Sequence, residues 1–515
     1  MPKTGNLGLC NKCRARVPAE FFQRDAQVWI RKDCPTCGPN ESLVSADAAV
    51  WQAKRDLWKY VPTDPVACTL NCNGCRVDHK PNMVFLDVTN RCNMNCPICI
   101  ATIRGMGFDF YPPLSYFQKV FAELGTWNPL PVVQLFGGEP TLREDLLEIV
   151  AIARRHGMKP HVVTNGVKLA DEAYCKKLCD DRVSFRFGFD GRSADIYEKM
   201  RHNRPAYEKK MKALENLKKY SKRKHTIIAA AAWGINDQYI GDLLQYIHDN
   251  RDLIADIGII PLTENWDPGE FNAAKTTTME DVEKMVQQAV PGGRIQFIPA
   301  GLSYALRKPR SFFRPDSRSE ILLMGGVHPN CESVTLLVSD GKTYRSINQY
   351  LKKPFPEVAS EWAQACDRIA PKLDRLDTKK FFQRQRGRAL VIRTLLPVVL
   401  RTVDFGKLTD GKPVRAVLKL LFGRLFGGPA AGAKGRRPRR LLRVAMLPFE
   451  ELHSVDAARM ENCKAVFAYE DTDDGKIKTI PACMWYPYRN PILKKLSEKY
   501  GIADRRKPAD AQASA

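Results

Sequence analysis

The sequence lacks any apolar stretch long enough to cross a membrane. A spanning helix needs about 20 consecutive apolar residues, and no run within the 515 residues approaches that length. The first residues, Met-Pro-Lys-Thr-Gly, also lack the apolar segment of a secretion signal. We therefore expect a cytoplasmic protein, in which cysteines bind metal as thiolates rather than form disulfides.

Acidic residues are in the minority. Aspartate and glutamate number 57 against 81 lysines and arginines, which gives a formal net charge of +24. A surface of this sign attracts nucleic acid, anionic lipid or acidic proteins, and charge alone does not choose among them. The apolar fraction of 44% is ordinary for a globular protein, and the length predicts two or more domains.

Cysteine is abundant and clustered. Ten of the 16 cysteines precede residue 100, in CxxC or CxxxCxxC spacings that scattered core cysteines would not show. The first four form two CxxC pairs on either side of an expected strand at 26–31. Such pairs make a tetrahedral site for zinc or a single iron; the plain alternative is a zinc ribbon that only stabilises the N-terminus. The four candidate ligands are Cys10, Cys13, Cys34 and Cys37.

A second group lies in a loop rich in glycine and asparagine. It comprises Cys68, Cys72 and Cys75, with His79 close behind. We interpret the three cysteines as ligands of an auxiliary iron–sulfur cluster. We expect His79 to lie beside that site rather than to bind metal, and its ligation stays open.

A third group follows an apolar run and carries the main chemistry. Cys92, Cys96 and Cys99 are spaced C-x3-C-x2-C. Three thiolates hold three irons of a [4Fe–4S] cube and leave the fourth iron open to a small molecule. The segment resembles the radical S-adenosylmethionine (radical SAM) enzymes, although Ile98 stands where that family usually has an aromatic residue. The resemblance implies that S-adenosylmethionine chelates the open iron and that its reduction yields a 5′-deoxyadenosyl radical.

Strand and helix patterns alternate from Met83 to Leu262. This alternation predicts an α/β fold with a parallel sheet and a site at the carboxyl ends of its strands. About six units suit the partial (βα)6 TIM-like barrel of radical SAM enzymes. Capping boxes are expected at 115–118 and 141–144. The expected strands are 83–88, 132–136, 161–164, 183–189, 226–232 and 256–261, and the expected helices are 116–124, 142–156, 171–179, 206–220 and 238–249.

A Gly-Gly-Glu-Pro motif at 137–140 follows the second expected strand. It matches the motif of the radical SAM family at the same place. In that family the glycines allow close backbone approach and the glutamate accepts from the methionine ammonium. Two polar residues after later strands resemble ribose contacts, and their plain alternative is loop capping. The resemblance assigns cofactor binding to Gly137, Gly138, Glu139, Pro140, Asn165 and Asp190.

Three further cysteines lie in the C-terminal half. Cys331 precedes an alternating run at 333–338, and Cys463 and Cys483 flank a hairpin signal at 465–480. Together with the earlier cysteine groups, they resemble the tetraether lipid synthase group, whose archaeal relatives include a pterin methyltransferase. That resemblance implies a rubredoxin-like N-terminal iron and two auxiliary [4Fe–4S] clusters, one from the loop triplet and one from these three cysteines.

Residues 385–445 differ in composition from the rest. An apolar stretch with basic residues at 414–426 could form an amphipathic helix, and a basic run follows at 434–440. Such a segment suits an anionic membrane surface; a buried helix with a linker is nearly as good an explanation.

Three functional hypotheses follow. The leading one is a radical SAM oxidoreductase or transferase that forms C–C bonds on membrane lipid chains. The second keeps the chemistry and methylates a pterin or another small heterocycle. The third, from another class, is a basic zinc-ribbon protein that binds or modifies RNA; the basic cluster beside apolar helices favours lipid over RNA, so we expect no nucleic acid partner.

The expected partners are S-adenosylmethionine, a reductant such as ferredoxin or flavodoxin, and lipid at the inner face of the membrane. The expected domains are a rubredoxin-like domain at 1–55, an auxiliary cluster loop at 56–82, the barrel at 83–300, an extension with Cys331 at 301–384, the basic amphipathic segment at 385–445, a cysteine hairpin at 446–500 and a disordered tail at 501–515.

Overall fold

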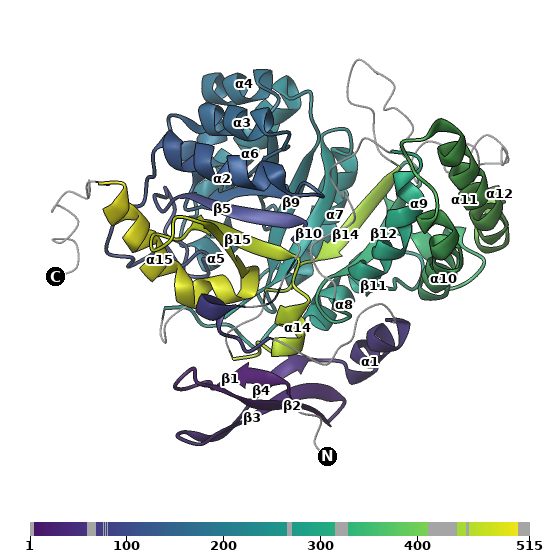
Figure 1. Cartoon of the computed structure of the whole chain (residues 1–515), viewed down its shortest axis with the longest axis horizontal. Helices are drawn as coiled ribbons and strands as arrows, with labels where there is room; N and C mark the ends of the chain where they lie inside the picture. Colours follow the sequence, from purple (N-terminus) through teal and green to yellow (C-terminus); the bar gives the residue numbers. More distant parts are fainter. Residues whose placement is uncertain are drawn as a thin grey trace.

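An N-terminal ribbon, a large sheet surrounded by helices, and a pair of long helices at one side make up the structure (Figure 1). The computed structural model describes residues 5–58, 68–75, 77, 79, 81–264, 270–314, 328–409, 440–449 and 453–502. The amphipathic helix expected at 414–426 and the basic residues 434–439 lie outside these ranges.

The ribbon is an antiparallel sheet of four strands in the order β1-β2-β3-β4. Its two cysteine pairs lie where β1 turns into β2 and where β3 turns into β4. Helix α1 follows, and the Asp47 side chain caps it by accepting from the Val50 backbone N–H at 3.0 Å. The bounds are β1 (Leu7–Leu9), β2 (Arg16–Arg24), β3 (Gln27–Cys34), β4 (Gly38–Ser45) and α1 (Ala48–Leu57).

Six parallel strands form the centre of the main sheet. Each strand pairs with the next in chain order, from β5 to β10. Their residues are mostly buried on both faces, as parallel strands covered by helices require. All six strands predicted from the sequence are confirmed: β5 (Met83–Thr89), β6 (Val132–Gly137), β7 (His161–Thr164), β8 (Ser184–Gly188), β9 (His225–Ala231) and β10 (Ile254–Pro261).

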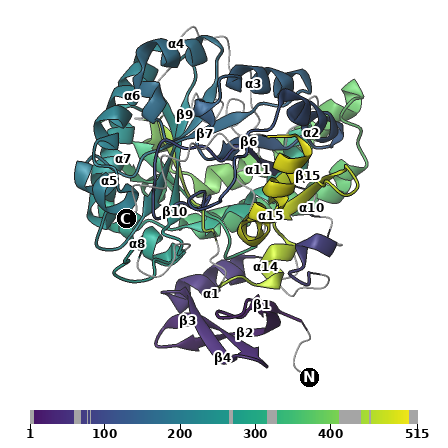
Figure 2. The same ribbon diagram turned by 90° about the vertical axis from the view of Figure 1, so that its left-hand side faces the viewer.

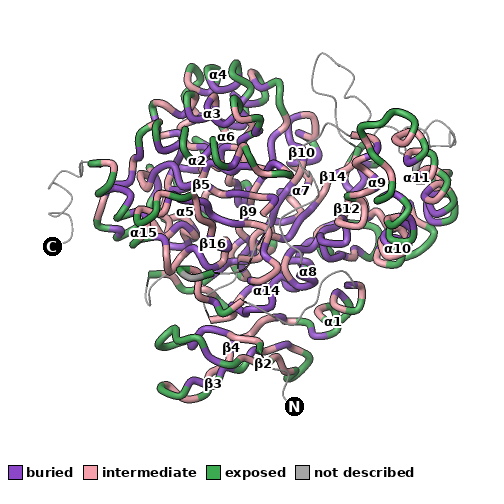
Figure 3. The backbone as a smooth tube through the Cα atoms, viewed as in Figure 1, coloured by how far each residue is buried: buried purple, intermediate pink, exposed green. Residues whose placement is uncertain are grey.

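Helices follow the strands and lie around the outside of the sheet (Figure 2). Their apolar faces join the strands in one extensive core, which Figure 3 shows as buried chain beneath more exposed helices. This arrangement is the predicted partial barrel. The helices are α2 (Leu114–Thr126), α3 (Leu146–Arg155), α4 (Glu172–Asp180), α5 (Ala194–Arg201), α6 (Ala206–Tyr220), α7 (Ile240–Asp249) and α8 (Met279–Ala289).

Segments from the second half of the chain extend both edges of this sheet. At one edge β15 (Ala465–Glu470) pairs in parallel with β5, and β16 (Ile477–Pro481) completes the predicted hairpin. At the other edge β14 (Leu441–Met446) pairs in parallel with β10, and β12 (Ser333–Ser339) pairs antiparallel with β14. The short strands β11 (Ile298–Pro299) and β13 (Tyr344–Ser346) pair with β12, and the remaining helices here are α9 (Arg307–Ser311), α14 (Ala457–Glu461) and α15 (Trp485–Lys499).

Two long helices at the side form a smaller core. In α10 (Phe355–Asp374) and α11 (Phe381–Thr402), buried residues such as Cys366, Val391 and Leu395 pack together; the short helix α12 (Phe405–Thr409) follows. The described part of the basic apolar segment thus contributes one face to a protein core. Among the described helices, none is long and apolar enough to cross a membrane.

A buried ion cluster joins α1 to α8. The ammonium of Lys54 lies 2.8 Å from a Glu280 oxygen and 2.7 Å from a Glu283 oxygen. Buried charges of this kind must be paired, because an unpaired charge away from water costs several kcal/mol. The ribbon side of the chain is therefore attached to the barrel by a specific contact.

Both capping boxes expected at 115–118 and 141–144 are wrong. Helix α2 begins at Leu114 after Pro113 and has no side-chain cap, and α3 begins at Leu146. The Thr141 hydroxyl instead donates to Glu139 at 2.6 Å. Thr141 therefore contacts a residue of the Gly-Gly-Glu-Pro motif and does not cap a helix.

Candidate active site

The loop after β5 carries the cysteine triplet. Asn90 holds the loop: its amide nitrogen donates to the Phe108 carbonyl at 2.7 Å, and its amide oxygen accepts from the Phe110 backbone N–H at 2.8 Å. Arg91 is paired with the buried Asp109. These contacts fix both ends of the segment from which Cys92, Cys96 and Cys99 project, and all three cysteines are half-buried.

Two of the three thiols of this loop, those of Cys92 and Cys96, have raised pKa values. Burial, followed by the charge of Glu139, raises the pKa of Cys92 to about 12. Burial also raises the pKa of Cys96, against the effect of the Arg201 charge. Thiolates are soft ligands for iron–sulfur clusters, and bound metal supplies the positive charge that these buried groups lack. The donor set therefore fits a [4Fe–4S] cluster.

The Gly-Gly-Glu-Pro motif packs directly on this loop. The Gly138 N–H donates to the Thr89 carbonyl at 2.7 Å, and the Glu139 N–H donates to the Arg91 carbonyl at 2.8 Å. A Cβ atom on Gly138 would lie 2.2 Å from the Arg91 carbonyl oxygen, which no side chain tolerates. Pro140 is buried and begins the next helical turn. The glycine is required by close approach of two backbones, as the sequence predicts.

Glu139 lies buried between the motif and the end of β7. Its Oε1 accepts from the Thr141 N–H and from the hydroxyls of Thr141 and Thr164, at 2.6–3.0 Å. Its Oε2 accepts from the Asn165 N–H at 2.7 Å. A carboxylate oxygen has two lone pairs, so Oε2 keeps one for a ligand ammonium. The role expected for Glu139 is compatible with this geometry, and the carboxylate also joins the segment after β6 to the end of β7.

Asn165 lies over the first cysteine. Its amide nitrogen lies 3.8 Å from the Cys92 sulfur and donates to the Asn93 side chain at 2.8 Å. Its side-chain oxygen accepts from Val167 N–H at 2.9 Å. The end of β7 is thus in direct contact with the cysteine loop.

Asp190 is buried, and its carboxylate is already engaged. Arg201 donates to both oxygens at 2.9 Å, and the Ala230 N–H donates to Oδ1 at 2.9 Å. The structure therefore gives Asp190 a role in positioning Arg201, and the ribose contact expected from the sequence stays a prediction.

Two cations next to Cys96 were missed at the sequence level. Burial opposes the charge on Arg201, but Asp190 and Cys96 raise its pKa overall. Burial lowers the pKa of Lys210 to about 8, and its ammonium donates to the carbonyls of Asn165 and Gly188. A cluster with thiolate ligands is anionic, so this positive pair stabilises it.

One of these cations did carry a sequence signal. Lys210 lies on the apolar face of α6, in register with the buried Ala206, Ala213, Leu214 and Leu217. A lysine in an apolar stripe must find buried partners. Arg201, at the end of α5, has no comparable signal in the sequence.

The four ribbon cysteines converge. Their sulfur atoms all lie within 4.8 Å of one another, and the Cys13 and Cys34 sulfurs are 3.6 Å apart. Four sulfurs at 2.3 Å from one tetrahedral ion would be about 3.8 Å apart. Backbone N–H groups of Cys13 and Lys12 lower the pKa of Cys10 to about 6. The predicted site therefore fits one zinc or one iron, with Cys10, Cys13, Cys34 and Cys37 as ligands.

The other cysteines that the sequence predicts to bind clusters form two neighbouring groups. Cys68, Cys72 and Cys75 line one pocket, and burial raises the pKa of Cys68 to about 11 and that of Cys72 to about 12. Burial, followed by the charge of Cys331, raises the pKa of Cys463 to about 12.

The C-terminal pair lies at the base of the hairpin. Val466 pairs with Pro481, which brings Cys463 and Cys483 to the same end of β15 and β16. The pKa of Cys72 is raised by burial and by several nearby charges, that of Cys463 among them. The structure therefore places the loop triplet, Cys331 and the hairpin cysteines in one region; their division between two clusters stays a prediction.

Two family profiles match this chain. Residues 86–247 match the Radical SAM superfamily, and residues 7–46 match the HMPTM N-terminal zinc ribbon domain. These two stretches contain the cysteine loop with its Gly-Gly-Glu-Pro partner and the four ribbon cysteines, respectively.

Individual proteins extend the comparison. The chain is 26% identical to the 7,8-dihydro-6-hydroxymethylpterin dimethyltransferase of Methanocaldococcus jannaschii over 96% of its own length and 95% of that protein. It is 30% identical to the Fe-coproporphyrin III synthase of Methanosarcina barkeri over 32% of its length and 40% of that protein. A crystal structure of Streptococcus suis SuiB bound to S-adenosylmethionine is similar over 40% of this chain and 46% of that one, with 15% identity and a TM-score of 0.32.

Proposed function

This chain is a radical SAM enzyme, and we propose that it methylates a reduced pterin or a closely similar heterocycle. One observation carries the proposal: the similarity to the archaeal pterin dimethyltransferase extends over nearly the whole of both chains. It includes the ribbon as well as the barrel, whereas the similarity to the coproporphyrin enzyme covers 40% of that protein. This chain and the archaeal dimethyltransferase thus share the parts that lie outside the barrel. Since one fold can host many activities, we take these added parts to determine the substrate.

The family's [4Fe–4S] cluster and S-adenosylmethionine, when bound, supply a carbon-centred radical that removes hydrogen from a substrate carbon. Cys92, Cys96 and Cys99 would hold the cluster. Arg201 and Lys210 supply positive charge beside Cys96. Glu139 and Asn165 line the same strand ends; Glu139 would orient the methionine part of the cofactor and Asn165 would contact its ribose.

A second pocket offers a place for the heterocycle. It has about 560 Å³ of empty space and lies between the ribbon, α1 and the carboxyl ends of β10 and β14. The aromatic residues Trp51 and Phe449 line it together with polar residues such as Thr263 and Asn330. Flat heterocycles bind where aromatic faces and a few hydrogen-bonding groups meet. We assign the substrate to this pocket.

The activity is tested under anaerobic conditions with the reconstituted chain, S-adenosylmethionine and dithionite. Adding 6-hydroxymethyl-7,8-dihydropterin with excess S-adenosylmethionine should give a methylated pterin by mass spectrometry. One S-adenosylmethionine is cleaved to 5′-deoxyadenosine and methionine, a second gives its methyl group and leaves as S-adenosylhomocysteine, and dithionite supplies both electrons, so both products should form in step with the methylated pterin. Deoxyadenosine without any change in the pterin mass would reject the proposal.

The pocket is tested by replacing one of its rings. Phe449→Ala should raise the KM for the pterin roughly tenfold, because a stacking ring contributes about 1–1.5 kcal/mol. Phe382→Ala, which changes an exposed ring on α11, is the matched control. An unchanged KM in Phe449→Ala would place the substrate elsewhere.

A lipid chain is the second candidate substrate, and one described feature favours it. Phe381 and Phe382 at the start of α11 are 58% and 85% exposed. Lys379, Lys380 and Arg386 around them are exposed as well. Exposed aromatic rings among cations suit the interface of an anionic membrane.

Deleting residues 410–440 and substituting Phe381 and Phe382 with serine test this candidate. Each change should reduce binding to vesicles that contain phosphatidylserine. Binding that is absent in the unaltered chain, or that neither change affects, would remove support for a lipid substrate at a membrane.

A further inference from the structure

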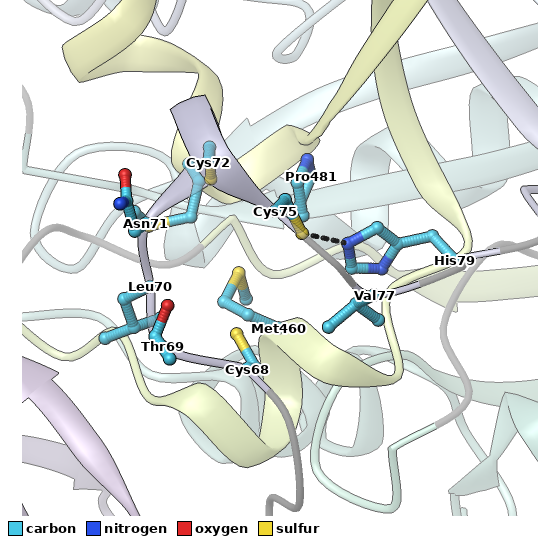
Figure 4. Close-up of a pocket in the computed structure, with 11 residues that line it drawn as sticks. Cys68, Thr69, Leu70, Asn71, Cys72, Cys75, Val77, His79, Met460 and Pro481 are labelled. Atoms are coloured by element: carbon cyan, nitrogen blue, oxygen red, sulfur yellow. Dashed lines mark hydrogen bonds between the residues drawn. The ribbon is translucent and has the colours of Figure 1, made fainter.

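One pocket is lined by cysteines and by no residue of the Gly-Gly-Glu-Pro motif. Cys68, Cys72 and Cys75 line it, together with Met460 and Pro481 from the C-terminal part of the chain (Figure 4). The pocket has about 290 Å³ of empty space. Residues from distant parts of the sequence therefore enclose three thiols around one space.

His79 lines the same space. It is 5% exposed, and its Nε2 lies 3.6 Å from the Cys75 sulfur, toward which the ring points (Figure 4). Its carbonyl oxygen accepts from the Lys464 ammonium at 2.6 Å, which fixes the backbone at that position. The sequence alone predicted that His79 lies beside the site without binding metal, because the spacing of residues does not show where the imidazole ring points.

The loop is held in place by the C-terminal segment. The Cys68 N–H donates to a Glu461 carboxylate oxygen at 3.1 Å, and the Cys72 N–H donates to the Tyr488 hydroxyl at 3.2 Å. Each contact reaches the backbone of a cysteine rather than its sulfur. The thiols are thus positioned while their sulfur atoms stay available for metal.

The spacing of the ligand atoms distinguishes between a cluster and a single ion. Within the part of the chain that the structure describes, only the ribbon cysteines gather within 4.8 Å of one another, as one tetrahedral ion requires. The ligands of an iron–sulfur cube bind separate iron corners. Although the ligand atoms of Cys75 and His79 lie 3.6 Å apart, no three of the ligand atoms of the described residues Cys68, Cys72, Cys75 and His79 gather within 4.8 Å of one another. The C-x3-C-x2-C spacing is also that of Cys92, Cys96 and Cys99.

We propose that Cys68, Cys72, Cys75 and His79 bind a [4Fe–4S] cluster, with the His79 imidazole on the fourth iron. Such a cluster has no open corner, so it carries electrons rather than binding substrate. A neutral imidazole in place of a thiolate makes the site less negative and raises its reduction potential relative to a four-cysteine cluster. The proposal does not depend on the identity of the substrate.

The test uses the full chain labelled with 15N-histidine and reconstituted with iron and sulfide, without S-adenosylmethionine, whose amino group would bring nitrogen to another cluster. Pulsed electron paramagnetic resonance of the reduced protein should show coupling to a histidine nitrogen. His79→Cys should keep the iron content, lose that coupling and lower the reduction potential. His248→Gln, which changes a buried histidine that bonds Ser339, should keep the coupling.

A second variant covers the case in which His79→Cys does not fold. Cys75→Ala should lower the iron content by up to about four per chain and remove the same nitrogen coupling. The proposal would be overturned if the nitrogen coupling persisted in His79→Cys. It would also be overturned if Cys75→Ala kept both the coupling and the full iron content. The proposal would also be overturned if the unaltered chain held one zinc that is lost in Cys75→Ala.

Discussion

Arg489 of α15 and Asp87 of β5 form an ion pair at 2.9 Å, and each side chain is only 2% exposed. The Trp485 indole N–H donates to the same carboxylate at 2.8 Å. Arg489 also donates to the carbonyl of Ala101, two residues after Cys99. One buried guanidinium thus connects the C-terminal helix, the first barrel strand and the cysteine loop.

Replacing only one residue of this ion pair should lower the stability of the fold. Arg489→Met leaves the Asp87 carboxylate buried without its cation, and we expect a loss of about 3–5 kcal/mol in stability. Asp87→Leu should cost a similar amount. The double variant should be more stable than either single variant, because it leaves no uncompensated charge. Thermal unfolding of the four proteins measures this; a double variant as weak as the sum of the single variants would show that the pair does not act as a unit.

The cysteine loop should be intolerant of any side chain at position 138. Gly138→Ala would push Cβ to 2.2 Å from the Arg91 carbonyl and displace the backbone just before Cys92. We expect at least a tenfold loss of 5′-deoxyadenosine formation. Gly241→Ala in α7 is the matched control, since its Cβ would meet no atom closer than 3.6 Å. Normal activity of Gly138→Ala would mean that the two loops move independently.

Removing two of the three loop thiols should abolish the radical chemistry. Cys92→Ala combined with Cys96→Ala should remove about four irons per chain and all deoxyadenosine formation. Cys175→Ala, in the core of α4, should change neither quantity. Iron content and product are measured on the same anaerobic preparation, and product formed by the double variant would refute the assignment of the cluster to this loop.

The ribbon metal should be separable from the barrel. Cys13→Ser removes one of four converging sulfurs, so one zinc or iron per chain should be lost and thermal stability should fall. Cys366→Ala, in the core of α10, should leave the metal content unchanged. Elemental analysis with thermal unfolding checks both. Full metal content in Cys13→Ser would show that the ribbon holds its ion without this ligand.

Acid should destabilise the barrel through His161. Burial, followed by the Arg186 charge, lowers the pKa of His161 to about 3. The unfolded chain binds a proton near pH 6.5 and the folded chain does not, so this stability is complete above about pH 6.5 and falls by up to about 1.4 kcal/mol per pH unit toward pH 3. Between pH 7 and pH 5, the melting temperature of His161→Phe should fall less than that of the unaltered chain. An equal loss in both proteins would place the acid sensitivity elsewhere.

Local patterns predicted the barrel well, because its strands are short apolar runs that are largely buried. His161–Thr164 and Ala206–Tyr220 match their elements at both ends. The capping box at 141–144 failed because the Thr141 hydroxyl donates to Glu139 instead. The one at 115–118 failed because α2 begins at Leu114, before the expected cap at Ser115. A four-residue pattern does not show which other side chains folding brings near.

The environment of the site was less predictable than its cysteines. Cys92 and its neighbours are defined by spacing, which a sequence shows directly. Arg201 depends on Asp190 across a turn, and Arg489 reaches Asp87 from the far end of the chain. Contacts of that kind have no periodicity, and only Lys210, a cation in an apolar stripe, could have been found in advance.

The pairing of β15 with β5 has a consequence for biosynthesis. The first barrel strand emerges from the ribosome early, yet the edge beside it is covered only when residues 465–470 have been made. Until then β5 presents an unpaired edge of the kind that promotes aggregation. The loop with Cys68 and Cys72 likewise waits for Glu461 and Tyr488. Iron should therefore reach the cysteine loops only after the whole chain has been synthesised. Stalled chains that end before residue 465 should aggregate and contain little iron.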